Sequence, residues 1–260
     1  MSSIFRRFAI LAALALAALL LTPTLHAHAR AARPQAGSPE TLLLDAANRD
    51  RAAAGLPPLQ WDMALSAAAR QHALRMVQAN TLSHQFPGEP ALQQRATDAG
   101  ARFSLIAENV AEGPSISGLH TQWMNSAPHR ANILDRDLNA VGIAVVQSGS
   151  LWFAVQDFSA AVPALNLDVQ ELQVGAQLSA RGLRLVTETT DARKTCDMDR
   201  GWSGPKPLAV LRYETPELGR LPEDVAVRLQ SGKYRTAAVG ACDAGTSAGF
   251  TRFRIAILLF

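Results

Sequence analysis

The chain of 260 residues is poor in cysteine, in aromatic residues and in net charge. Two cysteines are too few for a small scaffold held together by several disulfide bonds. Aromatic residues make up 6%, charged residues 18% and hydrophobic residues 48%, which excludes collagen and a disordered tail and indicates a globular protein. A formal net charge of +3 is too small for the basic field that gathers nucleic acid, so we expect no nucleic-acid partner.

The only long apolar run lies at the start of the chain. Arg6 and Arg7 precede the run from Phe8 to Leu21, and Ala27-His28-Ala29 fits a cleavage site between small residues. The alternative is a membrane anchor, but the run is shorter than the roughly 18 to 20 residues that cross a bilayer. We therefore predict a signal peptide over residues 1–29, no membrane span after its cleavage, and a secreted or periplasmic protein. Removal of Arg6 and Arg7 lowers the net charge from +3 to +1.

Both cysteines, Cys196 and Cys242, lie in the last quarter of the chain. An even count in an exported protein favours one disulfide bond between them. The alternative is a pair of buried free thiols.

The residues after the signal peptide divide into a linker, a helix-rich part and a strand-rich part. The linker spans 30–37 and is rich in Ala, Pro and Gly. Helix caps and apolar spacing predict helices over about 39–54, 62–79, 91–99 and 117–125, and a helical turn over 128–133. Two β-branched and aromatic runs, 141–146 and 151–158, flank a turn that contains Gly149 and predict a β-hairpin. Helices followed by strands favour an α+β fold.

After Ala160 the sequence consists of short runs with strand propensity, separated by Gly, Pro, Asp and Ser. These runs are 165–175, 182–189, 208–213, 225–229, 234–239 and 250–260. They predict a small all-β C-terminal domain over 161–260, stapled by the Cys196–Cys242 bond.

Four histidines follow the signal peptide, and two of them are placed to do chemistry. His72 and His120 lie within predicted helices among apolar residues, which is more typical of packed or surface histidines than of ligands. His84 lies in a loop, where sites concentrate on rigid scaffolds. His129 lies at the start of a helical turn, where backbone N–H groups are free to bind a ligand.

Two carboxylates, Glu108 and Glu112, are the acidic counterpart of these histidines. Their i, i+4 spacing places them on one face if the segment is helical. Two imidazoles and a carboxylate suit a divalent-metal or acid–base site. The alternative is a pair of solvated carboxylates near unrelated histidines.

Residues 42–158 resemble the CAP domain of cysteine-rich secretory, antigen 5 and pathogenesis-related proteins, in its bacterial SCP-like form. The matching features follow one another in the family's order: Asn48-Arg49, Leu56-Pro57-Pro58-Leu59, Trp61, Leu65 to Ala69, Ser83-His84, Ala107-Glu108-Asn109, Trp123, Asn132-Ile133-Leu134, Val141-Gly142-Ile143, Trp152 and Gln156-Asp157-Phe158. The resemblance implies an α-β-α sandwich with a central antiparallel sheet over 38–160. It also implies a cleft that, in many members, gathers two His and two Glu, sometimes around a divalent cation.

Carried over by position, the resemblance makes His84 and His129 the two histidines and Glu108 the first glutamate. The second glutamate follows the tryptophan by three positions in eukaryotic members, and here that position is Ser126. Glu112 is the candidate substitute. The incomplete set lowers the expectation of tight metal binding and of catalysis by two carboxylates.

Two catalytic patterns are better explained otherwise. Residues 245–249 spell G-x-S-x-G, but no histidine follows His129 and a strand-like run follows the pattern, so it is interpreted as a glycine-rich turn. Ser126 and His129 are helical i, i+3 neighbours, and Ser126 is equally well explained as a cap of the turn at Pro128.

The leading hypothesis is a secreted binding module that holds a divalent cation, with zinc preferred, or a small polar or lipidic ligand from the cell envelope. The cleft would comprise His84, Glu108 and His129, with Glu112 and Ser126 as further candidates, and His84 and His129 would be the metal ligands. The second hypothesis is a metal-assisted hydrolase of peptide or wall material, with Glu108 as general base. In the third, the CAP domain is a scaffold and the C-terminal domain binds a protein or wall partner.

Overall fold

The computed structural model describes residues 34–244, 246–247 and 249–260. The predicted signal peptide, the beginning of the predicted linker and two positions of the G-x-S-x-G pattern, 245 and 248, lie outside these residues. Within the described part of the chain, no helix combines the length and apolarity needed to cross a membrane.

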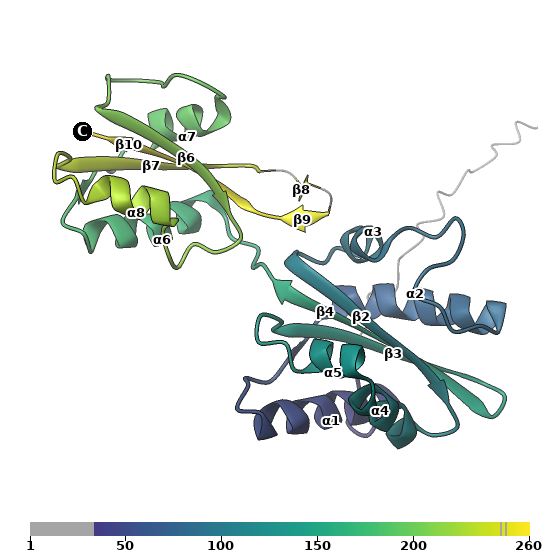
Figure 1. The fold of residues 1–260 in the computed structure, drawn as a ribbon. Helices are drawn as coiled ribbons and strands as arrows, with labels where there is room; N and C mark the ends of the chain where they lie inside the picture. Colours follow the sequence, from purple (N-terminus) through teal and green to yellow (C-terminus); the bar gives the residue numbers. More distant parts are fainter. Residues whose placement is uncertain (1–33, 245, 248) are drawn as a thin grey trace, which may run out of the picture.

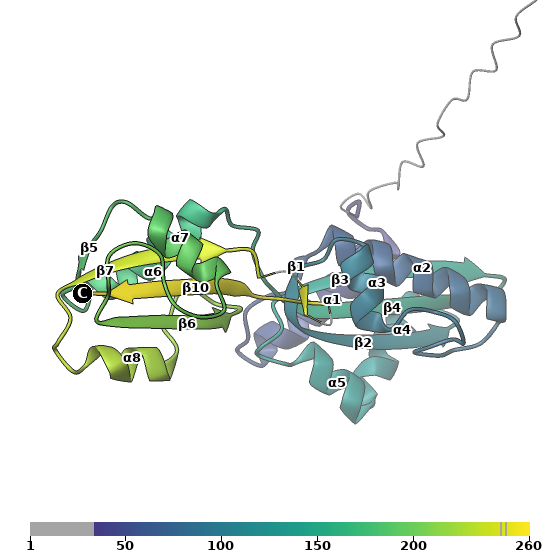
Figure 2. The same ribbon diagram turned by 90° about the horizontal axis from the view of Figure 1, so that it is seen from above.

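The first half of the described chain forms three layers around a four-stranded sheet (Figure 1). Its elements are α1 (Pro39–Ala53), β1 (Gln60–Trp61), α2 (Met63–Ala79), α3 (Leu92–Asp98), β2 (Phe103–Gly113), α4 (Ile116–Asn125), α5 (Ala127–Ile133), β3 (Ala140–Ser148) and β4 (Leu151–Ala161). The strand order is β1-β3-β4-β2, with β1 parallel to β3 and the other neighbours antiparallel. Helices α2 and α3 cover one face, and α1, α4 and α5 cover the other (Figures 1 and 2).

The predicted helix ends are confirmed by their capping contacts. The hydroxyl of Ser38 accepts a hydrogen bond from the backbone N–H of Thr41, at 3.2 Å, at the start of α1. Asp62 accepts from the first N–H groups of α2, and Asn80 ends that helix in the left-handed conformation, with φ of 45°. The predicted hairpin is β3 and β4, whose turn contains Gly149 with φ of 60°. These contacts satisfy backbone groups that a helix end leaves unpaired.

A buried arginine of α1 bonds the loop that follows this helix and the segment from the end of α5 to β3. Arg51 is 1% exposed, and its guanidinium donates to four backbone carbonyls, those of Pro57, Ile133, Asp135 and Leu138, at 2.7–3.0 Å. Burial lowers the pKa of Arg51 below its ordinary value, while the charge of Asp135 opposes this shift. The side chain thus replaces its lost hydration with backbone acceptors.

Helix α2 lies directly on the sheet because β3 carries a glycine under it. A Cβ atom at Gly142 would lie 2.1 Å from the backbone nitrogen of Ser66 and 2.2 Å from the carbonyl carbon of Leu65. Only glycine leaves room for this approach, and the neighbouring Ala68 and Ala69 are fully or almost fully buried. The close packing fixes the height of α2 above the sheet.

The second half of the chain forms another four-stranded sheet with helices on both faces (Figure 2). Its elements are α6 (Leu167–Ser179), β5 (Arg184–Leu185), α7 (Thr190–Asp197), β6 (Ala209–Thr215), α8 (Glu223–Leu229), β7 (Thr236–Cys242), β8 (Thr246–Ser247), β9 (Phe250–Thr251) and β10 (Phe253–Leu259). The strand order is β5-β7-β10-β6. Cys196 of α7 and Cys242 of β7 form the predicted disulfide bond.

The α+β class and the second small sheet are confirmed, but the second half does not consist of strands alone. The predicted strands over 165–175 and 225–229 are wrong, because these residues fall largely in α6 and α8, and α7 adds a third helix. In α6 the inward positions are Gln170, Glu171, Val174, Gly175 and Leu178. Two of these five are polar and one is glycine, so the apolar period that marks a helix is hidden in the sequence.

Candidate functional site

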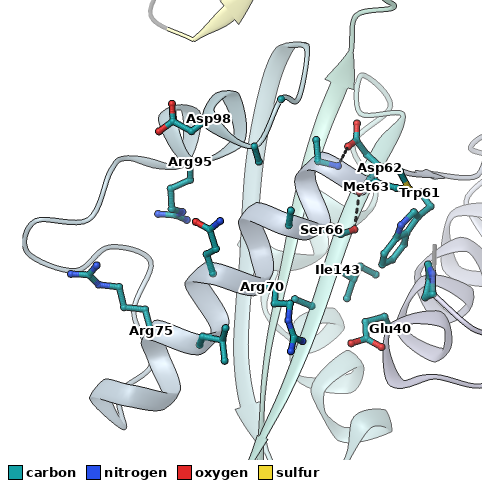
Figure 3. A pocket seen from close by; sticks show the side chains of 18 of the residues that line it. Glu40, Trp61, Asp62, Met63, Ser66, Arg70, Arg75, Arg95, Asp98 and Ile143 are labelled. Atoms are coloured by element: carbon teal, nitrogen blue, oxygen red, sulfur yellow. Dashed lines mark hydrogen bonds between the residues drawn. The ribbon is translucent and has the colours of Figure 1, made fainter. Parts of the chain in front are cut away.

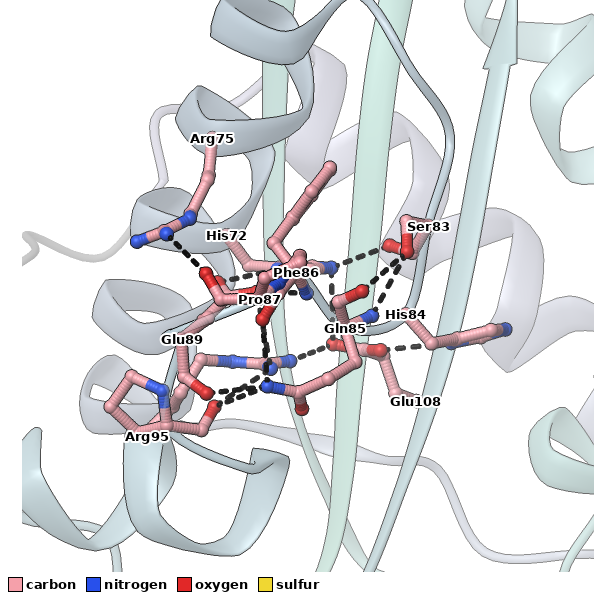
Figure 4. A network of polar contacts seen from close by, with 11 residues as sticks. His72, Arg75, Ser83, His84, Gln85, Phe86, Pro87, Glu89, Arg95 and Glu108 are labelled. Carbon is pink, nitrogen blue, oxygen red and sulfur yellow. Dashed lines mark hydrogen bonds and ion pairs between the residues drawn. The ribbon is translucent and has the colours of Figure 1, made fainter.

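His84 and Glu108 meet at the edge where the loop after α2 crosses strand β2 (Figure 4). The Nδ1 atom of His84 lies 2.9 Å from Oε1 of Glu108. The His84 side chain is 57% exposed, whereas that of Glu108 is only 4% exposed. A buried carboxylate therefore orients an exposed imidazole, and Nε2 remains for an outside ligand.

Glu108 is held from its other side by Arg95 of α3. The guanidinium of Arg95 donates from Nη2 to Oε2 of Glu108, and both side chains are 4% exposed. Arg95 also donates to the backbone carbonyl of Pro90, at 3.3 Å. Both carboxylate oxygens of Glu108 thus have nitrogen partners, and their negative charge is balanced inside the protein.

His72 of α2 fixes the loop that carries His84. It is fully buried, with Nε2 at 2.8 Å from the backbone oxygen of Ser83 and Nδ1 at 2.8 Å from Oε1 of Glu89. A carbonyl oxygen only accepts, so Nε2 donates to the oxygen of Ser83, while Nδ1 faces the carboxylate of Glu89. His72 therefore holds both ends of the loop between Ser83 and Glu89, in agreement with its prediction as a packed histidine.

His129 faces His84 from the start of α5. The centroids of the two rings lie 6.3 Å apart, with an angle of 41° between the ring planes. An amide network positions α5. Asn109 donates to the His129 carbonyl at 3.1 Å, and Asn132 donates to the Glu108 carbonyl at 3.2 Å. Asn132 also bonds Asn109, which bonds Gln156.

The two imidazoles have opposite electrostatic surroundings. The hydrogen bond from Glu108 raises the pKa of His84 above its ordinary value, against an opposing effect of burial. Burial lowers the pKa of His129, and the neighbouring His84 lowers it further. On acidification His84 therefore takes up a proton before His129 does.

Asp157 of β4 lies opposite Glu108 in the sheet and is completely buried. Neither of its carboxylate oxygens has a hydrogen-bond partner among the residues that the structure describes. Burial raises the pKa of Asp157 well above its ordinary value, and the charge of Glu108 raises it further. Both effects favour the protonated form of the carboxyl.

The structure brings together His84, Glu108 and His129 but not Glu112. The segment from 103 to 113 is the strand β2, so the conditional expectation of a helix there is wrong. In a strand, residues four apart are separated by about 13 Å, which carries Glu112 away from Glu108 along β2. Ser126 occupies the N-cap position of α5, although its side chain makes no capping hydrogen bond.

His120 lies outside this cluster. Its Nε2 is 2.6 Å from Oδ2 of Asp50, which joins α4 to α1. This placement agrees with its prediction as a packed or surface histidine.

Sequence reasoning missed Arg95, Glu89 and Asp157 as members of the cluster. The sequence does contain a signal for Asp157, because it is the one acid in the run from 151 to 158, where the only other polar residue is Gln156. Arg95 left a weaker one, since it occupies the same helical face as Leu92 and Ala96. Glu89 left no signal, because nothing in the sequence connects it with His72.

A large groove of about 1360 Å³ runs along α2 and borders this cluster. Figure 3 shows Trp61, Arg70 and Ile143 on one side of this helix and Arg75, Arg95 and Asp98 on the other. Arg95 and Glu89 also line the groove, but the lining does not include His84, Glu108 or His129. The two imidazoles therefore lie outside this groove.

The metal-ligating capacity of the cluster is limited to its imidazoles. Among the residues that the structure describes, no group of three or more His, Cys, Asp or Glu side chains is arranged to hold a metal ion. Glu108 is occupied by His84 and Arg95, so His84 Nε2 and the His129 ring are the free donors.

A four-stranded mixed sheet between helical layers, with two histidines and a buried glutamate at one edge, is the α-β-α arrangement that the CAP resemblance implies. Residues 44–158 match the family model of the cysteine-rich secretory protein family, CAP. This part of the chain is a CAP domain, as the sequence predicts.

Two curated relatives come from Bacillus subtilis. The chain is 33% identical over 114 residues to the uncharacterized protein YkwD, and 31% identical over 111 residues to the uncharacterized membrane protein YlbC. The matches cover 44% and 41% of this chain, but only 44% and 31% of those relatives.

Solved structures of an outer surface protein and of an extracellular protein are similar to part of the chain. The outer surface protein of Borrelia burgdorferi has 20% identity, a TM-score of 0.46, and coverage of 50% of this chain and 98% of that one. An extracellular SCP-domain protein of Bacillus anthracis has 30% identity and a TM-score of 0.43, with coverage of 46% and 40%.

Proposed function

We propose that the protein acts outside the cytoplasm as a binding module whose CAP domain holds a divalent cation through His84 and His129. The observation that carries the proposal is the contact between Glu108 Oε1 and His84 Nδ1, at 2.9 Å. A carboxylate bonded to one imidazole nitrogen orients the ring and makes the other nitrogen a better metal ligand. Zinc is the preferred cation, because neutral imidazoles are among its usual ligands.

The donor set fits an open site. Zinc takes about four ligands, and two imidazoles supply only half of them. The remaining positions would be filled by water or by donor atoms of a small polar ligand, lipid or cell-envelope component. Such an ion would serve to attach a ligand rather than to stabilise the fold.

The hydrolase hypothesis has less support. A general base needs a free carboxylate oxygen, but both oxygens of Glu108 are engaged, Oε1 by His84 and Oε2 by Arg95. Proton abstraction by Glu108 would require one of these buried contacts to break.

The proposed extracellular location rests on two features of the chain. One is the predicted signal peptide over residues 1–29, and the other is the Cys196–Cys242 disulfide bond. Disulfide bonds persist in oxidising compartments outside the cytoplasm.

Zinc titration by calorimetry tests the proposal on the chain that begins at Arg30. We expect one zinc ion per chain, with no measurable binding by the His84→Ala and His129→Ala variants. Glu108→Gln removes the orienting charge and should weaken zinc binding about 10- to 100-fold. His120→Ala is the matched control, since His120 pairs with Asp50 away from the cleft, and its affinity should equal that of the wild type.

The competing hypotheses have distinct outcomes. Absence of heat with the wild type, or equal affinity in His84→Ala, would refute the metal site. Turnover of a peptide or muropeptide mixture that disappears in Glu108→Gln would establish the hydrolase. Retention of a wall or protein partner by a fragment beginning near Pro163 would establish the scaffold hypothesis.

A further inference from the structure

The connection between β7 and β10 is longer than its place in the sheet requires. These strands are antiparallel neighbours, and Cys242 pairs with Arg254. Hairpin loops usually contain two to five residues. Here the connection instead carries a second two-stranded element, β8–β9, in which Thr246 pairs with Thr251. This element extends away from its own sheet towards the CAP domain and lies next to α3 (Figure 1).

The tip of this hairpin packs into the CAP domain. The ring of Phe250 meets the ring of Phe103 edge to face, with centroids 5.7 Å apart and planes at 80°. Phe250 thereby joins an apolar cluster with Leu65, Ala96 and Phe103. Edge-to-face aromatic pairs have a preferred geometry, so the contact specifies an orientation as well as burying surface.

A backbone contact places the hairpin directly against α3. The hydroxyl of Thr97 donates to the carbonyl of Gly249, at 3.1 Å. A Cβ at Gly249 would lie 3.0 Å from that hydroxyl oxygen and 3.4 Å from Cβ of Gln93. The residue also has φ of 84°, which favours glycine. The limited space beside α3 and the positive φ thus both favour glycine at position 249.

Helix α3 depends on such contacts for its position. It spans only Leu92–Asp98, and its N-cap residue, Ala91, makes no side-chain capping bond. A helix of this length is not stable by itself and takes its place from tertiary packing. The hairpin contacts α3 at Ala96 and Thr97, immediately after Arg95.

We infer that Gly249 and Phe250 are positioning residues for the His84 site, acting through α3, Arg95 and Glu108. Arg95 donates to Glu108, and Glu108 orients His84. Release of the hairpin would let α3 shift, and Arg95 would no longer hold Glu108 in one place. The part of the inference that concerns zinc rests on the proposed function, whereas the part that concerns the His84 ring does not.

The alternative is that Phe250 only stabilises the fold by burying apolar surface. A double-mutant cycle on the chain that begins at Arg30 separates the two, with Phe250→Ala and Arg95→Lys made singly and together. Zinc affinity and the ring-proton NMR signals of His84 are measured in each variant. Leu208→Ala is the control, because Leu208 lies in the second half of the chain and is 69% exposed.

If Phe250 positions the His84 site, Phe250→Ala should lower zinc affinity at least about five-fold and shift the ring-proton signals of His84. The effect of the double variant should then differ from the sum of the effects of Phe250→Ala and Arg95→Lys. Leu208→Ala should leave zinc affinity and the His84 signals unchanged. If the wild type binds no zinc, the proposed function fails, but the His84 signals still decide the inference. A folded Phe250→Ala protein with unaltered His84 signals and zinc affinity would overturn it. Phe250→Leu, which keeps an apolar side chain but no ring, replaces Phe250→Ala if that variant does not fold.

Discussion

Glu108 lies between an exposed imidazole and a buried guanidinium, and this position determines how the site responds to pH. The hydrogen bond to Glu108 raises the pKa of His84. The stabilisation from this pair is therefore complete below the ordinary histidine value of about 6.5 and is lost as pH rises through the higher pKa of His84. Zinc binding has the opposite dependence, because the metal must displace the proton from His84.

The two histidines should therefore titrate separately. In an NMR titration of the ring protons, His84 is expected to titrate above about 6.5 and His129 below it. Glu108→Gln removes the charge that raises the pKa of His84, so this pKa should fall towards its ordinary value. A less charged His84 should then lower the pKa of His129 by a smaller amount. Titration of both rings at the same pH in the wild type would contradict the geometry.

Arg51 makes a second prediction at the level of single residues. Its replacement by Met leaves four backbone carbonyls without their donor, and the two buried ones, of Ile133 and Leu138, each cost about 1–3 kcal/mol when unpaired. We expect Arg51→Met to reduce the free energy of unfolding in urea by at least about 3 kcal/mol.

Arg49 is the matched control for Arg51. It lies on the same helix but is exposed, so Arg49→Met should change the free energy of unfolding by no more than about 0.5 kcal/mol. Equal losses in the two variants would show that the backbone contacts of Arg51 contribute nothing.

At the level of elements, the sequence predicts those helices whose ends are fixed by contacts between residues close together in the chain. Helices α1 and α2 were predictable because Ser38, Asp62 and Asn80 mark their ends. Helices α7 and α8 make no side-chain capping bond at their N-caps, and Val225 is the only buried residue of α8. Their stability comes from packing on the second sheet, which no local pattern records.

The candidate site was predictable only where the family resemblance reached. His84, Glu108 and His129 follow from that resemblance, and the structure places them together. Strand β2 carries Glu108 and Asn109 on opposite faces, both buried, so it lacks the simple alternation of apolar and polar residues that marks a strand. The extended backbone of β2, which this pattern does not reveal, therefore decides that Glu112 lies away from the site.

Gly142 gives a prediction about packing between elements. A methyl group there would overlap the backbone of α2, so the helix must move away from β3. We expect Gly142→Ala to lower the free energy of unfolding by about 3 kcal/mol, measured in urea.

Gly219→Ala is the matched control for Gly142→Ala. The added Cβ at Gly219 meets only the end of the Glu217 side chain, at 3.3 Å, and that side chain is able to move. This variant should unfold with nearly the wild-type free energy. A similar loss at both positions would mean that the close approach of α2 is not what Gly142 provides.

At the level of the whole molecule, the disulfide bond belongs to the second sheet alone. Cys196 and Cys242 are 46 residues apart, and closing a loop of this length stabilises a folded state by about 4 kcal/mol in the chain-entropy description. Replacing both cysteines by Ala should therefore speed amide hydrogen exchange in β7 and β10. Exchange in β3 and β4 should remain slow, because these strands share no cluster with the cysteines.

Hydrogen exchange of the double Cys→Ala variant, read by mass spectrometry of peptides, checks this expectation. Equal acceleration in both sheets would show that they unfold as one cooperative unit, against the separation of their apolar clusters.

The topology of the two sheets also sets an order of folding during synthesis. Every strand of the first sheet has been made once Ala161 has emerged, whereas the second sheet has to wait for β10, which pairs with both β6 and β7. Domains generally fold as units, with the N-terminal part first. The β8–β9 hairpin, which contacts α3, immediately precedes β10. Its contact with the CAP domain is therefore made after the strands of the first sheet are complete. A chain that folds while it is made would form the His84 cluster first without this contact and would complete it about a hundred residues later, which takes about 5 to 20 seconds at ordinary rates of translation.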